Sequence, residues 1–415
     1  MRTLRILMLA GACAVAASGA AVALEVDPEV LPEINIGGRG VVTANYRDRD
    51  LASGGNDNGG ELDVADSSLL LGFSKFLFND VDYGFATIGF KAPDDDTDLG
   101  DDIFLHELHV GIGARVSELL LGRTRLTNTL IQFPTVRDDD LLDFTHVANA
   151  SSNAEAEEDT IYGTLLKGSY YLPRRRVALA GAVTARTETD ATNLANVGRV
   201  SRGNPNGISL SIAYDVPETI KFDRGLRFAG LTWDAQRAET FSGIGKDTVH
   251  SWIGALSYNL GENPEESWML DVQGIYTAGG TVPSLAQNIF RARADSYAVV
   301  GSLRYVHRPY LQTRWQAALT AAYKDFTDFD NAHSIALIPS FTWRAGSGVD
   351  LVAQYRFIDN GRGLASAVNR DTEHVVLFGA RFGFDFTLNE TVGQRGSILN
   401  LEHNMLDIGP VRVGD

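Results

Sequence analysis

The stretch Leu119-Leu120-Leu121-Gly122-Arg123-Thr124-Arg125-Leu126 has the composition of an apolar strand with two arginines near its end. It leads into residues 129–158, the longest irregular segment between strand-like runs, which carries Phe133-Pro134 near its start and acidic residues along its length. Long irregular segments are uncommon inside a regular domain and are often functional. What this segment does depends on the runs on either side of it.

The N-terminus has the pattern of a secretory signal peptide. Arg2 and Arg5 precede an apolar run over residues 6–22, and Ala21-Val22-Ala23 forms a small-x-small cleavage site. We therefore predict a signal peptide at 1–23, cleavage near Ala23 and export from the cytoplasm.

Two alternatives concern the same region. Ser18-Gly19-Ala20 is a second candidate cleavage site, and Cys13 could carry a lipid, although Ala10-Gly11-Ala12 lacks the usual leucine three residues before it. Cys13 is the only cysteine, so the mature chain would have no disulfide. That fits a periplasmic or outer-membrane protein better than a disulfide-stapled extracellular domain.

Charge and hydropathy narrow the class of protein. The formal net charge is −17, and about −19 without Arg2 and Arg5, which argues against nucleic acid as a partner. After the signal peptide, no apolar run approaches the roughly 20 residues that a helical membrane span needs. Since only helices and closed barrels satisfy backbone polar groups in lipid, the mature chain is either soluble or a barrel.

Alternation of apolar and polar residues with period two recurs along nearly the whole mature chain and predicts about sixteen strands. Most of the runs are long enough for a tilted strand to cross a membrane, which takes about 9–11 residues. We predict strands at 33–46, 63–78, 81–91, 102–114, 117–128, 160–172, 175–187, 207–215, 225–236, 247–260, 267–278, 295–308, 311–326, 333–344, 349–359 and 374–386.

The connections between these runs alternate in length. On one side they are short, as at Asn79-Asp80, Pro173-Arg174 and Pro309-Tyr310. On the other side they are longer, polar and often acidic, apart from the short one around 328–332. Short turns on one side and long loops on the other are typical of bacterial outer-membrane barrels, with turns in the periplasm and loops outside.

This pattern defines the predicted domains. Residues 24–32 form a short periplasmic segment and 33–386 form the transmembrane barrel, with both chain ends in the periplasm. Residues 387–415 form a periplasmic tail after Phe386 or an additional wall segment. If Ser397–Ile408 joins the wall, the count of sixteen is wrong.

The two faces of the runs differ in chemistry. Aromatic and aliphatic residues share one parity, as a lipid-facing surface with aromatic girdles requires; examples are Trp252, Leu256, Tyr258, Trp268, Tyr276, Trp315, Tyr323, Phe378, Phe382, Phe384 and Phe386. The opposite parity is polar and predicts a water-filled lumen; examples are Ser251, Ser257, Asn259, Asp271, Gln273, Thr320, Gln354, Arg356 and Arg381. Pro339 interrupts the apolar face of one run and predicts a bulge or a weak point there.

In architecture, the chain resembles the Gram-negative porin superfamily, because the longest loop follows the fifth strand and is acidic. Gly122-Arg123 before this loop, with Phe133-Pro134 inside it, is distantly similar to the phosphate-selective porin group. The resemblance implies an all-β, transmembrane antiparallel β-barrel with an inward-folded third external loop that narrows the pore. It also implies a possible homotrimer. Phosphate specificity is not carried over, because the chain lacks dense lysine clusters.

Charged residues at the constriction and on the lumen wall set selectivity in such channels. We predict that the pore constriction is formed by Arg123, Arg125, Asp138, Asp139, Asp140 and Asp143. If Leu120, Thr124 and Leu126 face lipid, the two arginines face the lumen. On the lumen wall we predict Arg39, Lys167, Arg304, Arg314, Arg356 and Arg381. The alternative is that these arginines pair with inward acids only to hold the loop.

Two further motifs have simpler explanations. The acidic run over residues 94–102 could bind calcium or bridge to lipopolysaccharide through divalent cations. However, Leu99 occupies the glycine position of an EF-hand and no Glu follows at the twelfth, so a solvated external loop is the simpler explanation of the acids. His106 and His109 lie three apart, so on a strand they point to opposite faces and cannot share a metal ion. We predict no metal site and no cofactor.

The sequence therefore predicts a passive diffusion channel for small hydrophilic solutes or ions, with no catalysis and a weak preference for cations. Its partners would be outer-membrane lipid and lipopolysaccharide, and its location the cell outer membrane. A substrate-specific channel and a barrel sheath for a partner complex are alternatives in the same architecture. A soluble secreted β-rich binding protein and an outer-membrane enzyme are alternatives from other classes.

Overall fold

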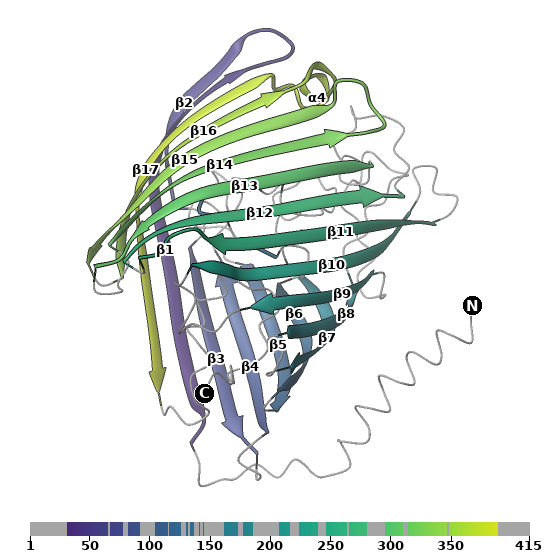
Figure 1. The fold of residues 1–415 in the computed structure, drawn as a ribbon, viewed down its shortest axis with the longest axis vertical. Coiled ribbons are helices and arrows are strands. Elements are labelled where there is room, and N and C mark those ends of the chain that lie inside the picture. Colours follow the sequence, from purple (N-terminus) through teal and green to yellow (C-terminus); the bar gives the residue numbers. More distant parts are fainter. Residues whose placement is uncertain are drawn as a thin grey trace.

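The chain forms a single antiparallel sheet of seventeen strands in a computed structural model (Figure 1). The structure describes residues 31–388 except 65–66, 78–81, 92–103, 115, 126–129, 132, 137–140, 142–143, 145–161, 173–176, 186–206, 216–223, 240–245, 264, 280–294, 310–313 and 347. The predicted signal peptide and most of the predicted C-terminal tail lie outside the described residues.

The first nine strands are β1 (Glu33–Asp50), β2 (Asn56–Asp63), β3 (Ser68–Phe76), β4 (Tyr83–Lys91), β5 (Phe104–Ala114), β6 (Ser117–Arg125), β7 (Tyr162–Leu172), β8 (Val177–Ala185) and β9 (Gly207–Asp215). The other eight are β10 (Gly225–Glu239), β11 (Lys246–Asn259), β12 (Glu266–Ala278), β13 (Ser296–His307), β14 (Trp315–Phe326), β15 (His333–Gly346), β16 (Val349–Asn360) and β17 (Thr372–Leu388). Each of the sixteen predicted runs corresponds to a strand of the structure.

The sheet closes into a barrel because β1 pairs along one edge with β17 and along the other with β2 and β3. β2 pairs with Thr43–Asp50 and β3 with Glu33–Arg39, so β2 and β3 act as two halves of one strand of the wall. The barrel therefore has the sixteen strands that the sequence predicts, plus one extra segment that it does not predict. Its wall closes without Ser397–Ile408, which lies outside the described residues.

β2 is the one strand that the sequence pattern misses. Residues 56–62 carry asparagine, aspartate and two glycines, a composition that favours a loop. Here the partner strand decides the outcome. The turn at residues 51–55 folds the chain back on β1, whose backbone then pairs with β2 in continuous register from Asp50 to Thr43.

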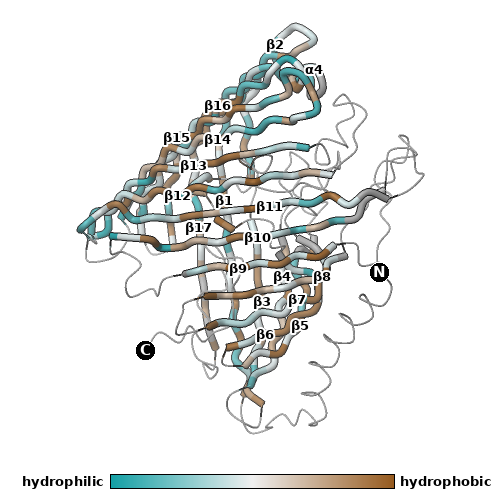
Figure 2. The backbone as a smooth tube through the Cα atoms, turned by 45° about the vertical axis from the view of Figure 1, so that its right-hand side comes forward, coloured by the Kyte–Doolittle hydropathy of each residue, from teal (hydrophilic) through white to brown (hydrophobic). Residues whose placement is uncertain are grey.

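The outward face is apolar, as predicted. Trp252, Trp268, Tyr276, Phe378 and Phe384 are each between 41% and 61% exposed on the outside of the barrel. Figure 2 shows brown apolar residues alternating with paler and teal residues along the strands. Ring contacts link neighbouring strands on this face, as between Trp252 and Tyr276.

Pro339 produces a weak point but no bulge. It pairs in register with Leu319 on β14. On its other side, the β15–β16 pairing omits two steps between Leu337↔Phe357 and Ser340↔Gln354, yet the register is the same before and after. The bulge expectation was therefore wrong, because an extra residue is not needed when the ladder simply skips the proline.

The turns at one end of the barrel are tight, as between β5 and β6 and between β15 and β16. At the other end, the helix α4 (Arg362–Val368) lies in the connection between β16 and β17 (Figure 1). No helix in the described residues has the length and apolar character needed to cross a membrane.

The sequence predicts a polar inward face, and part of this face is buried as well as polar. Thr232, Ser251 and Thr320 are at most 1% exposed. Each takes part in a hydroxyl pair with its cross-strand neighbour, at 2.8 Å for Ser211–Thr232, 3.2 Å for Ser251–Thr277 and 3.0 Å for Thr320–Ser302. These side chains satisfy one another where water is excluded.

Candidate functional site in the barrel lumen

The chain that follows β6 makes its described contacts with inward-facing residues of distant strands. The backbone N–H groups of Leu130 and Ile131 donate to Oε1 of Gln273 on β12, at 2.9 and 3.1 Å. One glutamine oxygen therefore accepts two consecutive N–H groups, and Gln273 is only 1% exposed. Buried backbone groups need such partners, so this side chain fixes the position of the segment.

The same segment is held again a few residues later. The Val136 N–H donates to Oε1 of Gln354 on β16 at 2.8 Å, and Oγ of Ser340 on β15 donates to the Pro134 carbonyl at 2.7 Å. Nη2 of Arg39 on β1 reaches the Val136 carbonyl at 3.5 Å. The described residues between 130 and 136, called here the 130–136 segment, thus contact strands on both sides of the β1–β17 closure.

Apolar packing supports these hydrogen bonds. Leu130, Ile131 and Phe133 are at most 6% exposed, as are Leu141 and Phe144 farther along. They share one buried cluster with inward residues of β8 to β15, called here the covered wall: Ala178, Ala180, Ala213, Phe228, Ile253, Ala255, Ile275, Ala298, Val300, Ala322, Ala336 and Ile338. Most of these wall residues are small, which leaves room for the larger side chains of the segment.

The parity that the sequence predicts for β6 is wrong. Leu119 and Leu121 are 40% and 56% exposed on the outside, whereas Leu120 packs inward against Tyr83 and Phe85. The ladder continues in register through Gly122 and pairs Arg123 with Leu108 and Thr164, which share the outward parity. Arg123 therefore does not have the lumen-facing parity that we predicted.

The reason lies in local composition. All three residues Leu119-Leu120-Leu121 are apolar, so the sequence alone does not say which parity faces lipid. The contact of Leu120 with an aromatic pair inside the barrel decides it. The side chain of Arg125 and residues Asp138, Asp139, Asp140 and Asp143 lie outside the described part of the chain, so their predicted roles stay predictions.

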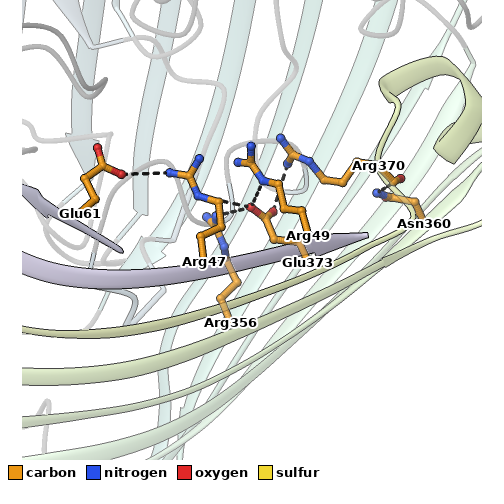
Figure 3. Close-up of polar contacts among 7 residues, drawn as sticks. All are labelled: Arg47, Arg49, Glu61, Arg356, Asn360, Arg370 and Glu373. Atoms are coloured by element: carbon orange, nitrogen blue, oxygen red, sulfur yellow. Dashed lines mark hydrogen bonds and ion pairs between the residues drawn. The ribbon is translucent and has the colours of Figure 1, made fainter. Parts of the chain in front are cut away.

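A cluster of arginines surrounds one glutamate on another part of the lumen wall (Figure 3). Glu373 on β17 is fully buried and forms ion pairs with Arg49 at 2.7 Å, Arg370 at 3.1 Å, Arg356 at 3.6 Å and Arg47 at 4.0 Å. The residues come from β1, β16, β17 and the connection before β17. Strand pairing at the barrel closure brings them together although up to 326 positions separate them in the chain.

Glu61 extends this group toward β2. Its carboxylate lies 3.3 Å from Nη2 of Arg47, and its side chain is 25% exposed. The group is called here the arginine wall and consists of Arg47, Arg49, Glu61, Arg356, Arg370 and Glu373. It lies at the end of the barrel where the longer connections are.

The arginines predicted for the lumen wall have mixed surroundings. Arg304 and Arg381 have the inward parity and pair with Asp271 at 3.0 Å and Asp350 at 3.3 Å. Lys167 also has inward parity, opposite Leu120 on β6 and Ala182 on β8. Arg314 lies just before β14 and is exposed. Its backbone N–H donates to the His307 carbonyl. Arg304 and Arg381 therefore pair with acids, as in the alternative interpretation, but these acids lie on strands β12 and β16 and not in the loop.

A second positive group lies near the short-turn end. Arg308, just after β13, is 1% exposed, and its Nη2 donates to Oγ of Ser267 at 2.6 Å. Burial lowers the pKa of Arg308 to about 10, and the nearby charges of Arg227 and Arg304 add to the effect. The Arg308 guanidinium is still protonated at neutral pH, and the neighbouring Arg304 pairs with Asp271.

Sequence reasoning missed Arg47, Arg49, Arg370 and Glu373. The signal was available for the first two, because the inward parity of Thr43 and Asn45 continues to Arg47 and Arg49 once β1 is extended to Asp50. Glu373 stands one residue before the predicted start of the last run. Their meeting depends on the register between β1 and β17, which no local pattern gives.

The chain is similar to solved structures in its fold. The anion-selective porin of Comamonas acidovorans has a TM-score of 0.57 and 15% identity, over 85% of this chain and 100% of that chain. The chain has the fold of an outer-membrane porin. The outer membrane channel DcaP of Acinetobacter baumannii gives a TM-score of 0.59 at 13% identity, over 88% of this chain and 100% of that one.

Salmonella typhi OmpF, solved with daunomycin, gives a TM-score of 0.56 at 12% identity, over 84% of this chain and 97% of that one. No protein-family model matches this porin-fold chain. No curated protein matches it in sequence. At these identities the comparison establishes the barrel, and the chemistry of the lumen has to be argued from the residues of this chain.

Proposed function

We propose that this protein is a passive diffusion channel for small hydrophilic solutes or ions in a Gram-negative outer membrane. The observation that carries the proposal is a closed barrel with an apolar outer face and partly exposed charged side chains on its inner face. Arg47 and Arg49 keep 27% and 20% of their side chains exposed although they point inward. Charged groups of this kind belong in a water-filled passage rather than in a sealed core.

We also propose that the chain after β6 folds into the barrel and narrows the passage. The hydrogen bonds of the 130–136 segment to Gln273, Ser340 and Gln354 support this, because all three side chains come from the inward face. Asp138, Asp139, Asp140 and Asp143 continue the same segment in sequence. They would place negative charge opposite the lumen-wall arginines, and Arg39 at Val136 would mark the narrowest level.

Arg123 and Arg125 take a different role in this proposal. With the outward parity of Arg123, the two arginines would lie at the rim where β6 ends and the long loop begins. Lipopolysaccharide carries phosphate groups that arginine binds well. They are therefore proposed as rim residues that contact the membrane, in place of the constriction role that the sequence predicts.

Single-channel recording in planar lipid bilayers tests the proposed function directly. The purified full-length barrel should produce stepwise, ohmic current increments in potassium chloride. A heat-modifiable gel mobility would show that the sample is a folded barrel before it is tested. A folded barrel that gives no current under these conditions would overturn the channel proposal.

A homotrimer is proposed as the working assembly, on the strength of the fold. A trimer form is recorded for the structurally similar OmpT of Vibrio cholerae, with a TM-score of 0.53 at 10% identity. The test is the mass of the detergent-solubilised protein by light scattering. A trimeric mass with currents that open in groups of three supports it, and a monomeric mass contradicts it.

A further inference from the structure

The pairing between β15 and β16, called here the β15–β16 seam, is interrupted at Pro339. By register Tyr355 lies opposite Pro339, and Arg356 lies opposite the residue before Pro339; the pairing omits both of these steps. Proline has no N–H group to donate to the neighbouring strand, so the ladder stops here and resumes in the same register. A wall in lipid depends on the hydrogen bonds between its strands, and this seam therefore has less backbone support than one with a complete ladder.

The two interrupted residues of β16 make contacts with β17. The hydroxyl of Tyr355 lies 2.7 Å from Nδ1 of His374. Nη2 of Arg356 lies 3.6 Å from the carboxylate of Glu373. These two contacts hold β16 to β17 and do not cross to β15.

The 130–136 segment crosses the β15–β16 seam on the inside of the barrel. Oγ of Ser340 on β15 donates to the Pro134 carbonyl at 2.7 Å. The Val136 N–H donates to Oε1 of Gln354 on β16 at 2.8 Å. Ser340 and Gln354 are cross-strand partners at the first step where the pairing resumes. Two groups that stand two residues apart in the segment are therefore bound to the two sides of the seam.

Apolar packing repeats this arrangement. Phe133 shares a buried cluster with Ile338 of β15, which is fully buried. Val136 shares another with Val352 of β16, which is also buried. The Thr135 N–H donates to the Phe133 carbonyl at 2.8 Å, and this bond fixes the fold of the segment between its contacts with the two strands. The segment thus packs on both sides of the seam as well as bonding to them.

We propose that the 130–136 segment is an internal strap that holds β15 to β16 across the break at Pro339. Its hydrogen bonds supply, from the lumen side, support that proline removes from the ladder. The lipid side offers no substitute, because lipid chains carry no hydrogen-bonding groups. If the segment also narrows the passage, as proposed above, the same residues hold the wall and limit the pore. The strap itself does not depend on the channel function, because its effect on the wall is measured without current.

A double-mutant cycle in the full-length barrel tests the strap. Ser340→Ala removes its hydrogen bond to β15, and Pro339→Val supplies an N–H group to the seam. We expect Ser340→Ala to lower the urea midpoint of unfolding, which is followed by heat-modifiable gel mobility. In the Pro339→Val background this decrease should fall to about half, because the restored pairing takes over part of the support. If Pro339→Val does not fold, Pro339→Ala supplies the same N–H group with a smaller side chain.

The matched control is Ser251→Ala. Oγ of Ser251 lies 3.2 Å from Oγ1 of Thr277, so this change also removes one hydroxyl hydrogen bond, but the β11–β12 pairing around it is continuous. The decrease of the urea midpoint in Ser251→Ala should be the same with and without Pro339→Val, because the two sites lie on different strand pairs.

Hydrogen exchange followed by mass spectrometry locates the effect. Ser340→Ala should raise the exchange rate of peptides from β15 and β16 about threefold and leave those from β11 and β12 unchanged. Ser340→Ala decreases that are equal in the two Pro339 backgrounds, or unchanged exchange in β15 and β16, overturn the strap and leave the channel proposal intact. A folded barrel that passes both tests but gives no current supports the strap and contradicts the channel.

Discussion

The covered wall and the arginine wall occupy the same inward face of one barrel but differ in chemistry. The covered wall, on β8 to β15, presents small residues such as Ala336 and buries them under Phe133 and its neighbours. The arginine wall, on β1, β2, β16, β17 and the connection before β17, presents arginine side chains that remain partly exposed around the buried Glu373. In the covered wall, apolar side chains fill the interior of the barrel. In the arginine wall, charged side chains stay partly exposed to the lumen.

The difference shows that inward parity does not by itself make a residue part of a pore. Gln273 and Gln354 both have inward parity and similar burial, and both accept N–H groups from the 130–136 segment. Arg356, two residues beyond Gln354, takes part in the charged cluster instead. The boundary between residues that hold the 130–136 segment and residues of the charged cluster therefore falls within one strand, β16.

The largest expected effect tests the arginine wall. Replacing Glu373 by Gln removes the negative charge that four guanidinium groups share. Removing one partner of a buried ion pair costs about 3–5 kcal/mol. We expect a clearly lower urea midpoint of unfolding. The midpoint is measured from the loss of the folded band in gel electrophoresis as the urea concentration rises.

Glu61→Gln is the matched control for this change. The Glu61 side chain is 25% exposed and, among the described residues, its ion pair is with Arg47, so its loss should cost less than about 1 kcal/mol. Equal decreases of the urea midpoint in the Glu373 and Glu61 variants would mean that Glu373 is not the centre of the cluster.

The next effect tests the covered wall. Phe133 is 4% exposed in the cluster, and truncation to Ala should cost about 3 kcal/mol in packing. Because the segment would be held less firmly, single-channel conductance should rise. Leu62→Ala, at a side chain that is 80% exposed, is the control and should change neither quantity. An unchanged conductance in Phe133→Ala would argue against a narrowing role for the segment.

A smaller effect concerns the hydrogen bonds that hold the segment. Gln273→Leu leaves the Leu130 and Ile131 N–H groups without this acceptor and should cost about 2 kcal/mol, whereas Gln354→Leu removes the acceptor of one N–H group of the segment, that of Val136, and should cost about half as much. Urea midpoints measure both. The reverse order would show that the β16 contact, and not the β12 contact, is the main support.

The smallest effect concerns the buried hydroxyl pairs between strands. Thr320→Val removes the donor to Ser302, whose hydroxyl lies 3.0 Å away, and should cost about 1 kcal/mol. Ser302→Ala and the double variant complete a double-mutant cycle, which isolates the pair from other effects of each change. Additive single effects would mean that the pair contributes no energy of its own.

The strands and their number could be predicted from the sequence because alternation is a local property. In any strand with lipid on one side, apolar and polar residues alternate with period two. The alternating lengths of the connections predict the orientation of the barrel in the membrane. Strand parity and strand position could not be predicted where local composition is ambiguous. Leu119-Leu120-Leu121 is apolar at both parities, and residues 56–62 resemble a loop although they form β2.

The candidate site was predicted less completely than the fold. Arg39 and Arg356 were assigned to the lumen from parity alone, and their contacts agree with inward positions. The acidic half of the predicted constriction lies outside the described residues and stays a prediction. The cluster around Glu373 was not predicted, because its members lie far apart in the chain and meet only through the pairing of β1, β16 and β17.

By itself, the sequence determined a chain of alternating strands with an apolar outer face, since the alternation follows from residues close together in the chain. Only the tertiary structure decided that Arg49 meets Glu373, because barrel closure pairs β1 with β17 across nearly the whole length of the protein. It also decided which inward polar residues are buried under the 130–136 segment and which stay exposed. Burial depends on what covers a side chain, and the covering residues come from another part of the chain.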